Sequence, residues 1–249
     1  MSLTTLTLGA DGRVRHRVPP DRLSNDLAGW IARDLVAPGL LRPNAFEQAF
    51  VSVVLSTAWR PVVAWESFYR NTLTALAAGG DPGGTNAGMA PVQQRATELA
   101  VGPDVVELGC CFGFLALQLA AAGHRVTAVD IAPGTVRLLA AMAPLLGLPV
   151  HAVAGDATAA PLADRCADTV LAVHLLEHLP AGVDVLVLAE MLRLARRRVV
   201  VAVPYEDVPD VAWGHVRTFD AAALHRLGAS TGHRYRVADH HGGWLVIDR

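Results

Sequence analysis

The chain has 249 residues, of which 52% are hydrophobic and 18% charged, so it is long and apolar enough to build a sizeable core. Its 21 basic residues are all arginine, and the formal charge of −2 excludes a general polyanion-binding surface, including one for nucleic acid. The absence of lysine excludes a catalytic lysine, and three cysteines, two of them adjacent, give no disulfide framework. Since no apolar run reaches about 18 residues and no apolar signal segment is visible, we expect a cytoplasmic protein without a membrane span.

The first 91 residues predict a small extension in front of the main domain. Residues 3–18 alternate on both sides of a GADG turn, which predicts a hairpin. Three helices are then predicted at about Arg22 to Val36, Asn44 to Ser56 and Val62 to Ala78. The glycine-rich stretch Gly79 to Met89 is expected to be flexible, either as a plain linker or as a lid.

The third of these helices carries an aromatic stripe. Trp65, Phe68 and Tyr69 fall at helical spacing with Leu73 and Leu76. Such a stripe indicates that these side chains pack in a core. The alternative is that the helix is a lid whose aromatic side chains line a substrate pocket.

Residues 92–249 alternate strands with helices. After a helix from about Val92 to Ala100, strands are expected near 105–108, 126–129, 150–154, 168–173 and 199–203, and a terminal pair near 235–239 and 244–247. The intervening helices are expected near 114–122, 133–146, 183–195 and 221–227, with Arg196 to Arg198 capping the third of them. We therefore predict an α/β, Rossmann-like fold: a seven-stranded, mostly parallel sheet with helices on both faces, behind the N-terminal hairpin and helical extension. The predicted domains are 1–91 and 92–249.

The glycine turn between the first two strands of this domain bears on which ligand the sheet binds. The run DVVELGCCFGFLALQLAAAGHRVTAVD, Asp104 to Asp130, reads as strand, turn, helix and strand. A dinucleotide fingerprint would need glycine at 109, 111 and 114, but Cys111 and Phe114 occupy two of these positions, which disfavours an NAD-dependent oxidoreductase. An acid two residues before Gly109 remains, together with a second glycine at 113. Asp130, at the tip of the next strand, suits the two hydroxyls of a ribose.

The sequence E-L-G-C-C-F-G resembles motif I of the class I S-adenosylmethionine (SAM)-dependent methyltransferases, and the resemblance extends over about residues 92 to 249. It implies SAM as the cofactor. Cys111 departs from the usual third glycine and leaves the turn slightly crowded. The resemblance places cofactor-binding roles on Glu107, Gly109, Cys110, Gly113, Asp130, Ile131, Asp156, Ala157 and His174.

Two histidines are candidates for the catalytic base. Methyl transfer to a hydroxyl needs an aligned acceptor and usually a base, and histidine titrates near neutral pH. His178 follows the fourth strand, and His215 lies in the loop after the fifth. Either can instead be an ordinary structural histidine. Glu177 is interpreted as orienting its neighbour or as merely solvated.

Two metal sites are also conceivable. The run from His174 to His178 matches the zinc-peptidase pattern H-x-x-E-H, but an apolar strand continues to His174 and Pro180 follows, which disfavours the required helix. An acidic loop offers a second set of ligands for a divalent ion. Its residues are Glu206, Asp207, Asp210 and His215. The metal requirement stays open at this point.

The finer resemblance concerns the acceptor. The runs VVELGCCFGFLALQLAAAG, HLLEHLP and PYEDVPDVAWGHVRTFD, behind a helical extension, are similar to the mycofactocin oligosaccharide methyltransferases of actinobacteria. That similarity implies O-methylation of a glucose on a glycosylated small molecule. The alternatives are a methyltransferase for another metabolite, such as a polyketide or quinone, and a non-catalytic SAM-binding protein. Neither nucleic acid nor membrane is expected as a partner, and a homodimer through the hairpin is an open option.

Overall fold

The computed structural model describes residues 5–249, which fall into two compact units. The first unit groups Met1–Pro91 with Val211–Gly214, and the second groups Val92–Asp210 with His215–Arg249. Residues 3 and 4 of the predicted hairpin lie outside the described residues. Within the described part, no helix combines the length and apolar composition that a bilayer crossing requires.

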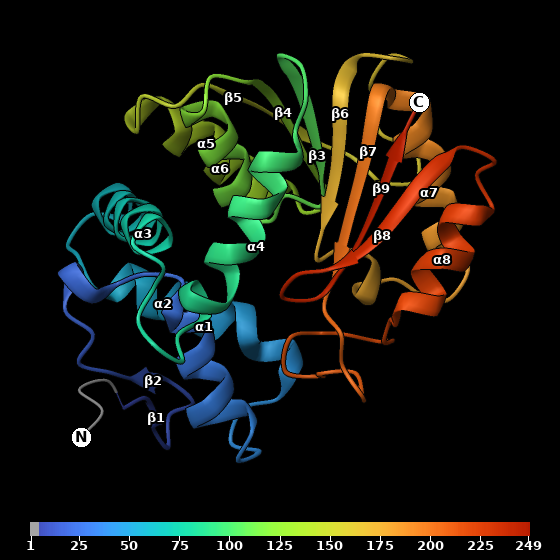
Figure 1. The fold of residues 1–249 in the computed structure, drawn as a ribbon. Coiled ribbons are helices and arrows are strands. Elements are labelled where there is room, and N and C mark those ends of the chain that lie inside the picture. The colour runs from blue at the N-terminus through green and yellow to red at the C-terminus, as the bar shows by residue number, and fades with distance from the viewer. Residues whose placement is uncertain (1–4) are drawn as a thin grey trace. The chain divides into compact units, whose positions relative to one another are not determined.

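The first unit is a hairpin followed by helices (Figure 1). Strands β1 (Thr7–Leu8) and β2 (Val14–Arg15) pair antiparallel, which confirms the predicted hairpin. Its helical elements are the 3-10 turns Pro20–Arg22 and Pro43–Ala45, α1 (Asp26–Ile31), a π-helical turn (Ala32–Val36), α2 (Phe46–Ser56) and α3 (Pro61–Ala77).

The aromatic stripe of α3 forms the core of this unit. Phe68 is fully buried, and its ring meets those of Phe50 at 5.5 Å, Trp65 at 5.6 Å and Tyr69 at 5.7 Å, all edge to face. Edge-to-face pairs add to the free energy gained by burying the rings. The stripe is therefore core, as the first of the two interpretations has it.

The expectation that the chain is flexible through Met89 is wrong. Helix α4 spans Thr85–Leu99 and therefore begins inside the predicted linker. Its N-terminus is capped from a distance, because the buried Asp26 carboxylate accepts the Asn86 N–H at 2.8 Å. Capping satisfies one of the unpaired donors of a first turn. Pro91 lies inside the helix and does not end it.

The second unit is built on a seven-stranded sheet in the order β5-β4-β3-β6-β7-β9-β8 (Figure 1). The pairings among the first five strands of this order are parallel, and β9 pairs antiparallel with β7 and β8. This confirms the predicted α/β, Rossmann-like fold. The strands are β3 (Asp104–Leu108), β4 (Arg125–Asp130), β5 (Val150–Ala154), β6 (Ala167–Val173), β7 (Ala195–Val203), β8 (Arg234–Asp239) and β9 (Gly243–Asp248).

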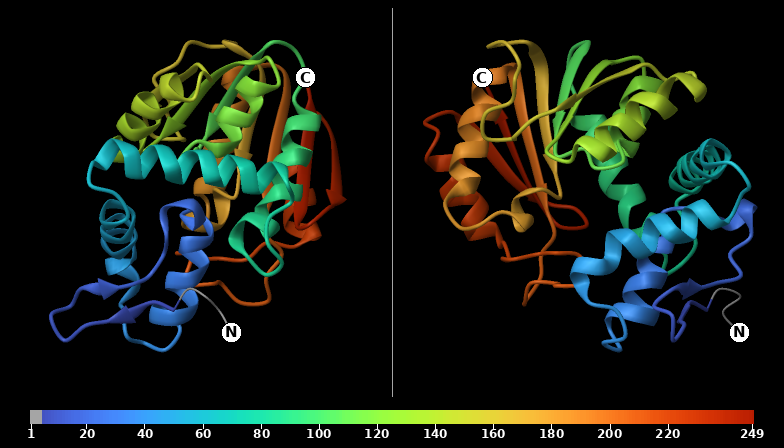
Figure 2. Two further views of the ribbon diagram at one scale, coloured as in Figure 1. Left: turned by 90° about the vertical axis from the view of Figure 1, so that its left-hand side faces the viewer. Right: turned by 180° about the vertical axis from the view of Figure 1, so that it is seen from behind.

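Helices cover both faces of the sheet (Figure 2). Helices α5 (Phe114–Ala121) and α6 (Pro133–Leu145) pack on β4 and β5, whereas α7 (Val183–Leu194) and α8 (Ala221–Ala229) pack on β6, β7, β8 and β9. Side chains alternate along β3, so Val106 and Leu108 join the core beneath α7 and α8. Val105 and Glu107 therefore face the opposite layer.

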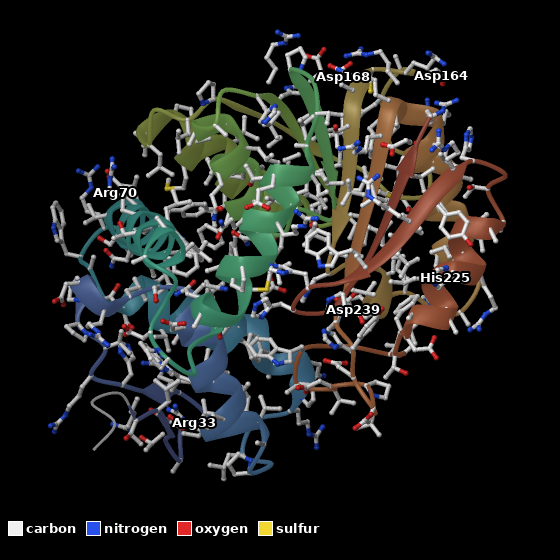
Figure 3. The ribbon with its side chains drawn as sticks, in the orientation of Figure 1. Arg33, Arg70, Asp164, Asp168, His225 and Asp239 are labelled. Atoms are coloured by element: carbon white, nitrogen blue, oxygen red, sulfur yellow. The ribbon has the colours of Figure 1, made fainter. Side chains whose placement is uncertain are left out.

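The predicted role of Arg196 to Arg198 as helix caps is wrong, because α7 ends at Leu194 and β7 begins at Ala195. Arg196 binds two aspartates, Asp104 at 2.6 Å and Asp168 at 3.0 Å. Asp168 lies at the amino end of β6 (Figure 3), and its bond to Arg196 holds its pKa below the ordinary value. These ion pairs mark the amino edge of the sheet. Ligands of open α/β sheets bind at the opposite, carboxyl edge.

Candidate active site

The turn after β3 has three residues in the left-handed region of the backbone. These are Gly109 at φ 75°, Cys111 at φ 48° and Gly113 at φ 78°. A Cβ atom on Gly109 would collide with Leu175, and one on Gly113 would collide with Leu139. Glycine is therefore required at 109 and 113 by both backbone conformation and packing. The contact with Leu175 also ties this turn to the segment that follows β6.

Cys111 occupies a left-handed backbone conformation that favours glycine, and its side chain is exposed. A left-handed conformation costs an L-residue about 1–2 kcal/mol. We expect Cys111→Gly to raise the free energy of unfolding by about 0.5–1 kcal/mol, after the entropic cost of glycine is subtracted. Urea denaturation followed by fluorescence measures the change.

Cys110→Gly is the matched control for this prediction. Cys110 is buried and has no positive φ, so its replacement should lower stability. A loss of stability in Cys111→Gly as large as that in Cys110→Gly would contradict a strained turn.

Asp130 connects the glycine turn to the end of β4. Its Oδ2 accepts the Cys111 N–H at 2.8 Å, and its Oδ1 accepts the Ala132 N–H at 2.9 Å. These two bonds fix the carboxylate at the tip of the strand, half-exposed. The next residue, Ile131, is 73% exposed beside this carboxylate.

Asp156 lies beyond the end of β5 and is exposed. Its Oδ1 accepts both the Thr158 N–H at 2.8 Å and the Thr158 hydroxyl at 2.7 Å, which together lower the pKa of the carboxyl. The half-buried Ala157 lies between them in this turn. The role of Thr158 in holding Asp156 is not visible in the sequence motif.

Glu107 is buried beside the glycine turn. Burial, together with the nearby charge of Asp130, raises the pKa of Glu107 to about 8, against the lowering effect of the Ala116 N–H bond. Its Oε2 has no hydrogen-bond partner among residues 5–249. A buried polar atom without a partner costs free energy, and such an atom is commonly satisfied by a ligand.

His215 is held by a carboxylate. Its Nδ1 lies 2.8 Å from Glu206 Oε2 and 3.0 Å from Oε1, and its side chain is 8% exposed. A carboxylate at Nδ1 favours the tautomer that carries its proton there, which leaves Nε2 as a hydrogen-bond acceptor. The two sequence candidates for the base come together, because the His178 ring centroid lies 4.9 Å from that of His215 and the rings meet edge to face.

The segment after β6 supplies three further titratable groups. His174 has φ 52°, and burial together with the charges of His215 and His178 lowers its pKa to about 4, so it is neutral at pH 7. Glu177 is 1% exposed, which makes the interpretation of a solvated carboxylate wrong. Burial raises the pKa of Glu177 to about 8. His174 Nδ1 lies 3.7 Å from Glu177 Oε1, too far for a hydrogen bond.

The geometry separates the two metal patterns of the sequence. The peptidase pattern requires one helix through His174 and His178, whereas His174 is left-handed and only Leu176–His178 form a 3-10 turn. Within residues 5–249, the ligand atoms that come together are those of Glu177, His178 and His215, all within 4.8 Å of one another. Asp207 and Asp210 of the predicted acidic set are exposed and are not part of this group.

Comparison with known proteins finds a family match in part of the second unit. Residues 105–198 match the family model of a methyltransferase domain. No curated protein matches the chain.

Solved structures share the fold. A SAM-dependent methyltransferase from Aquifex aeolicus is 17% identical, with 71% of this chain and 96% of that chain covered and a TM-score of 0.53. Magnesium protoporphyrin IX methyltransferase from Synechocystis, with bound S-adenosylhomocysteine, is 17% identical over 72% of this chain and 94% of that chain, with a TM-score of 0.53. A methyltransferase from Methanococcus maripaludis, described as SAM-dependent, is 12% identical. The match covers 73% of this chain and 93% of that chain, with a TM-score of 0.54.

Proposed function

We propose that the chain is a SAM-dependent methyltransferase and that it methylates a hydroxyl group of a glycosylated small molecule, a glucose of the mycofactocin oligosaccharide. The observation that carries an O-methyl acceptor is the His215–Glu206 pair, a histidine held by a carboxylate beyond β7. A hydroxyl is a poor nucleophile until it loses its proton, so a positioned base is what this acceptor needs.

The residues around the glycine turn suit SAM. Glu107 Oε2 is a buried acceptor without a partner, and Asp130 presents a fixed carboxylate at a strand tip. Asp130 would bind the ribose hydroxyls, Ile131 would lie against the adenine, and Asp156 with Ala157 would bind the adenine amino group. The methionyl part would lie along the turn. The residues proposed for it are Glu107, Gly109, Cys110, Gly113 and His174.

The bound cofactor supplies an electrophilic methyl carbon on a positively charged sulfur. The chain supplies the rest: His215 Nε2 takes the hydroxyl proton, Glu206 stabilises the charged imidazole, and His178 lies edge-on beside it. In this role Glu206 is a positioning residue, and His215, with His178 beside it, is the proposed base. The proton then passes from His215 to water.

Two features bear on the acceptor class. Glu206 and the exposed Asp207 offer hydrogen-bond acceptors to sugar hydroxyls, and the resemblance in three sequence runs supports a glucoside. Val208 and Val216, 73% and 58% exposed, favour the second candidate, a more apolar acceptor such as a polyketide or quinone. A glycosylated metabolite with an apolar aglycone would satisfy both.

Calorimetric titration and an acceptor panel test the proposal. We expect S-adenosylhomocysteine to bind, NAD not to bind, and Asp130→Ala to abolish the binding, because the ribose would lose its carboxylate. Oligoglucosylated acceptors should then gain one methyl group by mass spectrometry. Binding of NAD alone would overturn the cofactor, and methylation of quinones or polyketides only would overturn the glycosylated acceptor.

A further inference from the structure

Three ligand atoms at the carboxyl edge of the sheet are arranged for a cation. One ligand atom each from Glu177, His178 and His215 lies within 4.8 Å of the other two. Ligands bound at about 2.0–2.2 Å to one zinc ion lie somewhat closer together than this, so small side-chain rotations close the set.

Glu177 supplies the independent observation that a ligand belongs here. Its side chain is 1% exposed, and neither carboxylate oxygen accepts a hydrogen bond from any residue between 5 and 249. Both oxygens are thus buried without a hydrogen-bond partner in the described part of the chain, and His174 lies near one of them at 3.7 Å. A bound cation would supply the partner that a buried carboxylate requires.

The backbone holds the ligands in register. Glu177 and His178 lie on the 3-10 turn after β6, and His215 lies in the loop after β7. The Val216 N–H donates to the Glu177 carbonyl at 2.9 Å, and the His215 N–H donates to the Asp210 carbonyl at 3.1 Å. Glu206 engages Nδ1 of His215, which leaves Nε2 as the nitrogen that can bind a metal, and carboxylates commonly hold metal-bound histidines in this way.

We propose that Glu177, His178 and His215 bind a zinc ion with a fourth position open to the acceptor hydroxyl. Two histidines and one carboxylate with an open position are a ligand set of catalytic zinc. This inference takes the acceptor hydroxyl from the proposed function. With zinc bound there, the ion would replace His215 as the activator of the acceptor hydroxyl. The O–H bond would break with its proton released to water, the O–CH₃ bond would form, and the electron pair of the broken methyl–sulfur bond would leave with S-adenosylhomocysteine.

Zinc titration of the full chain tests this site after removal of metal with a chelator. Competition with a chromophoric chelator should show one Zn²⁺ per chain. The zinc affinity should fall more than about 100-fold in Glu177→Gln and in His178→Ala, each of which removes a ligand. It should fall about 10–100-fold in Glu206→Gln, because that change alters only the residue that holds His215. Far-UV circular dichroism and S-adenosylhomocysteine binding verify that each variant is folded.

Cys111→Ser is the matched control, because Cys111 is exposed and next to Cys110, the commonest alternative kind of zinc ligand. Co²⁺ substitution gives a second readout: nitrogen and oxygen ligands produce visible d–d bands without the thiolate charge-transfer band. Zinc binding that persists in Glu177→Gln and disappears in Cys111→Ser would overturn the proposal, as would no binding at all. If the zinc site is refuted, methyl transfer by the chelator-treated enzyme would still support the proposed methyltransferase function. If no methyl transfer occurs with or without zinc, the proposed function itself is refuted.

Discussion

His215→Ala is expected to lower the rate of methyl transfer about 100- to 10,000-fold, the range that removal of a general base produces. The physical reason is the geometry at one ring: Glu206 occupies Nδ1 at 2.8 Å, so Nε2 is the nitrogen left to accept a proton or a metal ion. The loss is therefore expected with and without added zinc. Steady-state kinetics with a saturating acceptor measures it.

Two variants make this result specific. His178→Ala should cost less in the metal-free enzyme, because His178 is exposed and contacts the His215 ring edge to face, whereas His215 is the ring that Glu206 holds. His233→Ala is the control: this exposed histidine directly precedes β8 at the amino edge of the sheet, and its replacement should leave the rate unchanged. A His215→Ala enzyme that binds S-adenosylhomocysteine and still transfers methyl groups at the wild-type rate would refute the assigned base.

The fold could be predicted from the sequence because strands and helices have different patterns of apolar residues. Apolar runs that alternate with helices predict the sheet, and their order predicts the terminal antiparallel strand. Local patterns failed where a distant residue decides the structure. Arg196 follows an apolar helix and looks like a cap, but its partners, Asp104 and Asp168, come from two other strands. The start of α4 was missed for the same reason, since its cap comes from Asp26 in α1.

The candidate site also has a part that the sequence predicts and a part that it does not. The glycine turn and Asp130 lie within one short stretch of sequence, so their spacing is enough to make them candidate site residues. The structure adds that the backbone of Cys111 is left-handed. The grouping of Glu177 with His215 could not be predicted, because a strand and a helix separate them in the chain. The burial of this acid could not be predicted either: a glutamate next to a histidine and a proline-containing loop is usually solvated, yet Glu177 is 1% exposed.

Glu107 gives the second large effect, on the pH dependence of stability. Its folded pKa is about 8, whereas an unfolded glutamate titrates near 4.5. Between these values the folded chain keeps a proton that the unfolded chain releases, so rising pH favours unfolding. Stability from this group is fully present below about pH 4.5 and is lost as pH rises toward 8, at up to about 1.4 kcal/mol per pH unit. His174, whose pKa is lowered to about 4, acts with the opposite sign, because acid favours unfolding there.

We therefore expect Glu107→Gln to gain stability relative to wild type by several kcal/mol between pH 5 and pH 8, because the amide is neutral throughout while the carboxyl must ionise. Urea midpoints of both proteins at each pH give the difference, in which the contribution of His174 cancels. Glu98→Gln, the same substitution at an exposed acid of α4, is the control for the exchange itself. If the Glu107→Gln difference did not change with pH, Glu107 would have to be ionised in the folded chain, and its buried Oε2 would need a partner other than a proton.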